Sequence, residues 1–89
     1  MTLSGVITVT TAGAAVKGPN TAGFAVAVKA HPSNTDVVWI GNDGAGDVAA
    51  ANGFPLEAGE AVVVPGNLEQ YWFDANVNGE KLCWLVVSR

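Results

Sequence analysis

The chain has little charge, and this scarcity excludes one broad class of function. Only 13% of its 89 residues are charged, whereas a typical soluble domain has about 25%. The four cations, Lys17, Lys29, Lys81 and Arg89, are scattered singly, and the formal net charge is −4. Because binding to a phosphate backbone needs several clustered cations, the sequence argues against direct binding to nucleic acid.

Cysteine, histidine and long apolar runs are also scarce. Cys83 is the only cysteine and His31 the only histidine, so neither an intrachain disulfide nor a zinc site of several Cys and His ligands is expected. We interpret His31 as a loop residue beside a proline, and Cys83 as a small buried hydrophobe. No run approaches the roughly 18 apolar residues of a transmembrane helix, and the first residues lack the basic start of a signal peptide. These absences predict synthesis in a reducing cytoplasm without membrane association.

No set of catalytic residue types can be assembled from the sequence. The acidic side chains are dispersed, mainly at predicted turns: Glu57, Glu60, Glu69, Asp74 and Glu80. A glycosidase needs two facing carboxylates, and a domain of this size offers little cleft, so solvated charge is the preferred interpretation. We therefore predict a protein that is not an enzyme and that needs no cofactor.

The run at residues 42–47 (NDGAGD) resembles a ligand-binding loop only superficially. It lacks the GK[ST] ending of a phosphate-binding loop, as well as the alternating ligands and distant Glu of an EF-hand. Gly, Asp and Asn are typical turn residues. We predict a turn, and whether residues 43–47 bind a cation is left open.

What the sequence does contain is a strong period-two alternation. Residues 5–11 (GVITVTT) place Ile7 and Val9 on one face, and residues 23–30 (GFAVAVKA) place Phe24, Val26 and Val28 on one face. Such alternation predicts half-buried strands. Residues 37–41 are apolar on both faces, which predicts a central strand.

Further strand and turn signals define the expected fold. Residues 61–64 predict a strand ended by Pro65 and Gly66, and residues 31–36 predict a loop. Strands spaced by about 8–12 residues indicate a sandwich or barrel. We predict an all-β fold over residues 1–89 as a single domain. Its expected form is a small antiparallel β-sandwich or barrel, jelly-roll-like or β-tulip-like, with about seven to eight short strands.

The end of the chain carries the strongest hairpin signal. Asn78 and Gly79 lie between two β-rich segments, which favours a type I′ turn. A two-residue turn would place Phe73 opposite Trp84 and Tyr71 opposite Val86. One face would then be continuously apolar: Tyr71, Phe73, Ala75, Leu82, Trp84 and Val86. The other face is apolar at its base, at Trp72, Leu85 and Val87, so we expect the base to be buried on both sides.

The aromatic content is large for a chain of this size. Seven aromatic residues are present, and each buries about 150–250 Å², which is more than a small two-layer core easily hides. With so few charges to cover the surface, we expect some apolar area to be covered by another chain. Trp39 and Trp72 are interpreted as core or interface residues, with a sugar-stacking platform as the alternative.

Several segments together resemble a known family. They read ITVTTAGAAV at residues 7–16, KAHPSNT at 29–35, VWIG at 38–41, GFPLEAGE at 53–60 and FDANVNGEKLCW at 73–84. The set is similar to small β-sandwich virion proteins of tailed bacteriophages, which decorate the head or form accessory structural parts. The segment at residues 43–47 is longer than the turn found there in that family, which suggests an outward-facing loop.

The resemblance implies a structural function. It implies a capsid decoration protein that folds in the host cytoplasm, binds the exterior of the head as a homo-oligomer, expected to be a trimer, and stabilises the lattice of the major capsid protein. The residues we expect at oligomer or capsid contacts are Trp39, Phe54, Leu56, Trp72 and Leu85. The alternative is a small carbohydrate- or receptor-binding module on the virion surface or tail.

Overall fold

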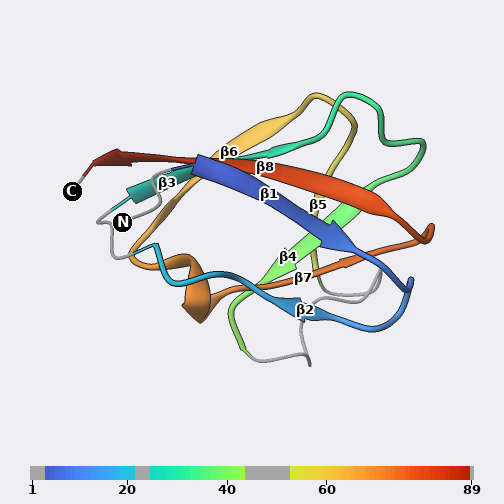
Figure 1. Cartoon of the computed structure of the whole chain (residues 1–89), viewed down its shortest axis with the longest axis horizontal. Helices are drawn as coiled ribbons and strands as arrows, with labels where there is room; N and C mark the ends of the chain where they lie inside the picture. Colours follow the sequence, from blue (N-terminus) through green and yellow to red (C-terminus); the bar gives the residue numbers. More distant parts are fainter. Residues whose placement is uncertain (1–3, 22–24, 44–52, 89) are drawn as a thin grey trace.

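The computed structural model describes residues 4–21, 25–43 and 53–88 of the chain. They form two four-stranded antiparallel sheets that lie face to face (Figure 1). The predicted all-β class and sandwich architecture are confirmed. The first sheet has the strand order β1 (Ser4–Val9), β8 (Glu80–Ser88), β3 (Ala25–Ala30), β6 (Ala61–Pro65). The second has the order β2 (Val16–Lys17), β7 (Trp72–Ala75), β4 (Val38–Gly41), β5 (Phe54–Leu56).

The hydrophobic core lies between the two sheets and follows the alternation of the strands. Ile7 and Val9 of β1 and Val26 and Val28 of β3 are all buried, which confirms the faces predicted for these residues. Phe24, predicted on the same face as Val26, lies outside the described residues. The core also contains Ala30, Val38, Ile40, Leu56, Val64, Leu68, Tyr71, Phe73, Ala75, Leu82 and Trp84. Because successive strand residues point to opposite faces, the residues between these core positions point outward.

The predicted central strand is confirmed as well. β4 lies between β7 and β5 in the second sheet, so both of its edges are paired. The turn expected after it, with the possible cation site at residues 43–47, lies outside the described residues from residue 44 onward.

The predicted hairpin at Asn78 and Gly79 is wrong. β7 pairs with β2 and β4, whereas β8 pairs with β1 and β3, so the connection between them crosses from one sheet to the other. Gly79 does have a positive φ of 83°, but its N–H donates to the carbonyl of Val9 at 2.8 Å. The expected Phe73–Trp84 pair therefore faces across the core instead of lying side by side.

A short 3₁₀ helix, η2 (Leu68–Gln70), precedes β7 and anchors the segment that follows β2. The Asn67 side chain caps η2 by accepting from Glu69 N at 3.0 Å, and it also accepts from Thr21 N at 2.9 Å. A Cβ at Gly18 would lie within 2.1 Å of the Leu68 carbonyl oxygen, so only glycine allows this approach. These contacts hold the chain after β2 against the base of the second sheet.

Candidate functional site

The outer face of the first sheet is an apolar feature of the described surface, and its strand register defines it. Leu85 of β8 lies beside Ala27 of β3, which lies beside Val63 of β6. In the neighbouring row, Val6 of β1 lies beside Cys83 of β8. We call this set, together with Val87, the aliphatic face: Val6, Ala27, Val63, Cys83, Leu85 and Val87.

Four members of the aliphatic face are strongly exposed. Val63 is 60% exposed, Val6 57%, Leu85 53% and Val87 51%. Single exposed apolar residues are normal, but an apolar patch shared by neighbouring strands is typical of an interaction surface. Between them, Ala27 and Ala61 are small, and a shallow hollow of about 250 Å³ lies over these residues and Leu85. The face therefore combines exposed apolar area with a concave region.

The charges on this face are of one sign. Lys29 of β3 and Lys81 of β8 point outward at one end, and both are exposed. The acidic residue of β8, Glu80, is only 5% exposed and points inward. The chain has a net charge of −4, yet the exposed charged residues of the described strands beside the aliphatic face are lysines. A partner surface with apolar residues and a carboxylate at one end would complement it.

The structure separates the five predicted contact residues. Leu85 lies on the aliphatic face, and Phe54, 55% exposed, lies on the edge strand β5. Leu56 is 3% exposed and belongs to the core, so its side chain is not available to a partner. Trp39 and Trp72 are half-buried on the outer face of the second sheet. Sequence reasoning missed Val6 and Val63, although the apolar run AVVVP of β6 signals a strand that is apolar on both faces.

Two further expectations need correction. The base of the predicted hairpin is not buried on both sides, since Leu85 and Val87 are each more than half exposed. Cys83 is half-buried on the outer face of the first sheet and does not belong to the core. The physical reason is the same for all three side chains: β8 has a second apolar face, and no described element covers it.

The outer face of the second sheet is organised differently, because polar contacts cover it. Asp74 lies opposite Trp39 in the β4–β7 pair and is buried. Its Oδ1 accepts from Gly13 N at 2.9 Å and Ala75 N at 2.8 Å. Trp39 Nε1 donates to Asn76 Oδ1 at 3.2 Å. The turn around residue 13 and the segment after β7 are therefore both hydrogen-bonded to this sheet.

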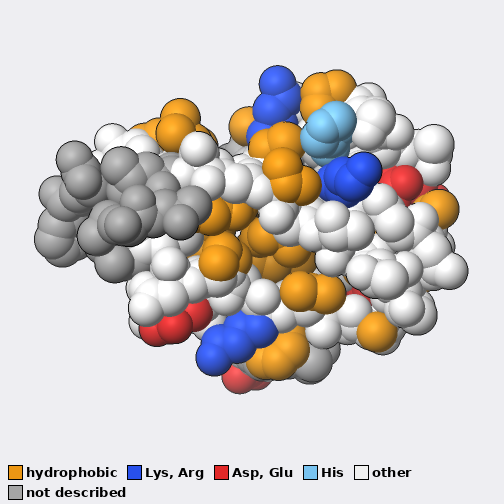
Figure 2. All heavy atoms as spheres, in the orientation of Figure 1, with side chains coloured by type: hydrophobic (Ala, Val, Ile, Leu, Met, Phe, Trp, Pro, Cys, Tyr) orange, Lys and Arg blue, Asp and Glu red, His pale blue; other side chains and the backbone are white. Residues whose placement is uncertain are grey.

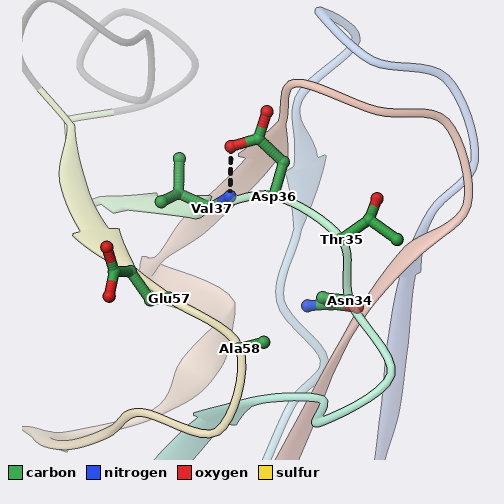
Figure 3. Close-up of a pocket in the computed structure, with 6 residues that line it drawn as sticks. All are labelled: Asn34, Thr35, Asp36, Val37, Glu57 and Ala58. Atoms are coloured by element: carbon green, nitrogen blue, oxygen red, sulfur yellow. Dashed lines mark hydrogen bonds between the residues drawn. The ribbon is translucent and has the colours of Figure 1, made fainter.

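A polar hollow of about 210 Å³ lies at the end of the sandwich where the loop of residues 31–36 meets the turn after β5 (Figure 3). Asp36 and Glu57 are the carboxylates among its six lining residues. Asp36 Oδ1 accepts from Val37 N at 2.7 Å. The Thr35 hydroxyl donates to Glu80 Oε1 at 3.2 Å, and its N–H donates to Oε2 at 3.0 Å. Because the Thr35 hydroxyl and N–H already bond to Glu80, we interpret these contacts as holding the loop of residues 31–36 in place, and the hollow as a result of that loop's position.

The loop position predicted for His31 is confirmed. Its Nδ1 lies 2.7 Å from the Ser33 hydroxyl and accepts from Ser33 N at 3.1 Å, so the ring is engaged within its own turn. Within residues 4–21, 25–43 and 53–88, no group of three or more His, Cys, Asp or Glu side chains could hold a metal ion. In that same part of the chain, no helix has the length and apolar character to span a membrane.

Comparison with known proteins identifies no relative. No protein-family model, no curated protein and no solved structure matches this chain.

Proposed function

We propose that this chain is a structural accessory protein of a tailed-bacteriophage head, which docks on the outer shell as a homo-oligomer, a trimer, and stabilises it. The observation that supports this proposal is the aliphatic face, with four side chains more than half exposed on one sheet. The family resemblance of residues 7–16 and 53–60 supports the same role. In this role the chain needs apolar area and symmetry, and it needs no reactive group.

The energetics favour docking in many copies over a tight single contact. Fully burying one aliphatic side chain contributes about 1.5–3 kcal/mol, so covering the exposed halves of four such side chains contributes roughly 4 kcal/mol. Association itself costs at least about 4 kcal/mol. One face therefore binds weakly, whereas several copies linked in an oligomer on a repeating lattice bind strongly through avidity.

The test uses heads of the encoding phage prepared without this protein, and the purified chain. We expect the purified chain to sediment with these heads. A Val63→Lys, Leu85→Lys double variant should bind the heads at least tenfold more weakly. Val77→Lys is the matched control, because Val77 is also exposed but lies outside the first sheet. A purified chain that is monomeric and does not bind these heads would disprove the proposal.

The second candidate function is glycan or receptor binding through Trp39 and Trp72. The observation that favours it is their position: Trp39 lies opposite Asp74, and Trp72 lies two residues along the same strand, so both tryptophans are on one outer face. Diagonal neighbours of this kind are about 7–8 Å apart, within the span of a sugar unit. Unchanged tryptophan fluorescence on titration with sugars, together with an empty glycan array, would remove this candidate.

A further inference from the structure

A second candidate site lies at one open side of the sandwich, between the strands β1 and β2. There a groove of about 470 Å³ runs between them, lined by Gly5, Val6, Ile7, Thr8, Val16, Lys17, Pro19 and Trp84. In the orientation of Figure 1, β1 lies in front. In the same orientation, Figure 2 shows apolar side chains gathered in the hollowed middle of the molecule. The hollow of the aliphatic face lies instead over β3, β6 and β8, and Trp84 is the one residue that lines both.

Both walls of this groove are edge strands. Among the described strands, β1 pairs with β8 alone and β2 with β7 alone, so each is the terminal strand of its sheet. A terminal strand presents a row of backbone N–H and C=O groups that the sheet does not use, and an extended peptide can pair with this row. The geometry therefore provides main-chain donors and acceptors along β1, beside an apolar floor.

Trp84 supplies a second, independent observation. It lies opposite Gly5, and because Gly5 has no side chain the indole ring extends over it: a Cβ at Gly5 would lie 2.9–3.1 Å from Cζ2, Cε2 and Nε1. Trp84 is 7% exposed, yet among the described residues its Nε1–H has no hydrogen-bond acceptor. Buried tryptophan N–H groups usually have a partner. An acceptor oxygen supplied in the groove would satisfy this one.

The charge of the groove indicates the chemistry of its occupant. Lys17 of β2 is exposed and is the charged residue among those that line the groove; it lies opposite Trp72, so its side chain stands at the rim of the groove and Val16 faces the interior. A carboxylate on the occupant would complement it. The edge strands of the first sheet read SGVITV in β1 and AVVVP in β6 and carry no acidic residue. Pairing with an edge strand of a second copy is therefore less favourable than pairing with an acidic segment of another protein.

We propose that the groove between β1 and β2 binds an extended, acidic peptide segment of a partner protein. The segment adds a strand to the free edge of β1, places an acceptor oxygen at Trp84 Nε1–H and pairs a carboxylate with Lys17. This site does not depend on the head-decoration proposal, because it uses the free edge of β1 and needs no capsid lattice; Val6 is the one residue that it shares with the aliphatic face.

The test is an NMR titration of the ¹⁵N-labelled chain with the capped peptide TVEVTV and its lysine counterpart TVKVTV. We expect shifts at the Trp84 indole N–H and at the amides of Gly5 to Thr8, and about fivefold tighter binding of the acidic peptide, as for one accessible ion pair. TVEVTV with alternate backbone amides methylated should not bind, because it cannot complete the strand pairing.

Three variants assign the contacts. Lys17→Glu should reverse the preference between the two peptides, whereas Lys29→Glu, a lysine outside the groove, should leave it unchanged. Trp84→Phe keeps an aromatic ring but removes the N–H, and should weaken TVEVTV about fivefold. Folding of each variant is checked from its amide spectrum. If Trp84→Phe fails to fold, the Lys17→Glu reversal and the methylated peptide still decide the outcome.

Three results would overturn the proposal. The first is the absence of shifts at β1 when either peptide is raised to several millimolar. The second is equal affinity for the acidic and the basic peptide. The third is a change in the β1 amides with protein concentration alone that persists in the Val63→Lys, Leu85→Lys variant, which would show that a second copy occupies the edge.

Discussion

The two sheets share one core but present opposite kinds of outer surface. The first sheet exposes the aliphatic face, with lysines at one end, and no described element covers it. The second sheet carries Trp39, Trp72 and Asp74, and the turn around Gly13 and the side chain of Asn76 bond to it. Described loops are thus hydrogen-bonded to the outer face of the second sheet, whereas none covers the first. This asymmetry makes the first sheet the better candidate for docking.

The largest expected effect compares two leucines on opposite sides of β8. Leu82 is fully buried and Leu85 is 53% exposed. Leu82→Ala should lower the free energy of unfolding by about 3 kcal/mol, because it leaves a cavity, whereas Leu85→Ala should cost less than about 1 kcal/mol. Denaturant unfolding at low protein concentration, where association does not contribute, measures both. Equal costs would mean that Leu85 belongs to the core.

The next effect tests how the second sheet is covered. Asp74→Ala should cost about 2 kcal/mol, because the N–H groups of Gly13 and Ala75 lose their acceptor in a buried setting. Asp36→Ala is the matched control: Asp36 is exposed and, within the described part of the chain, its side chain accepts from Val37 N alone, so a cost below about 0.5 kcal/mol is expected. Both are measured by thermal or denaturant unfolding. A neutral Asp74→Ala would contradict the interpretation that polar contacts lock this face.

A smaller effect separates the two tryptophans of the second sheet. Trp39→Phe removes the indole N–H that donates to Asn76, and should cost about 1 kcal/mol. Trp72 has no such bond within the described part of the chain, so Trp72→Phe should cost less. If Trp72→Phe proves the more damaging change, the packing of that ring outweighs the hydrogen bond that distinguishes Trp39.

The smallest effect concerns Tyr71, the only tyrosine in the chain. Its hydroxyl donates to the Pro65 carbonyl at 2.8 Å, and burial raises the pKa of the phenol above the ordinary value of 10.0. Tyr71→Phe should cost roughly 0.5–1 kcal/mol at neutral pH.

The pH dependence of this variant has a definite sign. Above about pH 10 the phenol ionises in the unfolded chain before it ionises in the folded chain, so the natural protein loses stability there. Tyr71→Phe lacks this loss, and the difference in unfolding free energy between the two proteins should shrink as the pH rises from 9 to 11. A difference that grows with pH would contradict the pKa direction.

Much of the strand layout could be predicted from local patterns. The alternation in residues 5–11 and 23–30 identified the buried faces of β1 and β3. In a strand with one solvent-exposed face, apolar and polar residues alternate with period two. The side chains of β7 and β8 that face the core, among them Phe73 and Trp84, were also predicted correctly. What the pattern could not distinguish was whether these faces lie side by side in one sheet or opposite each other across a core, since both arrangements bury the same side chains.

The candidate sites depended far more on the tertiary structure. By itself the sequence determined an all-β chain with too little charge for its apolar content, and it predicted five contact residues, of which Leu85 and Phe54 are more than half exposed. Only the fold decided that Leu56 is internal, that Val6 and Val63 join Leu85 on one face, and that Trp84 lines the open edge of β1. The physical reason is that exposure and groove geometry depend on which strands become neighbours. Strand neighbours are set by contacts between residues far apart in the chain, which local periodicity does not record.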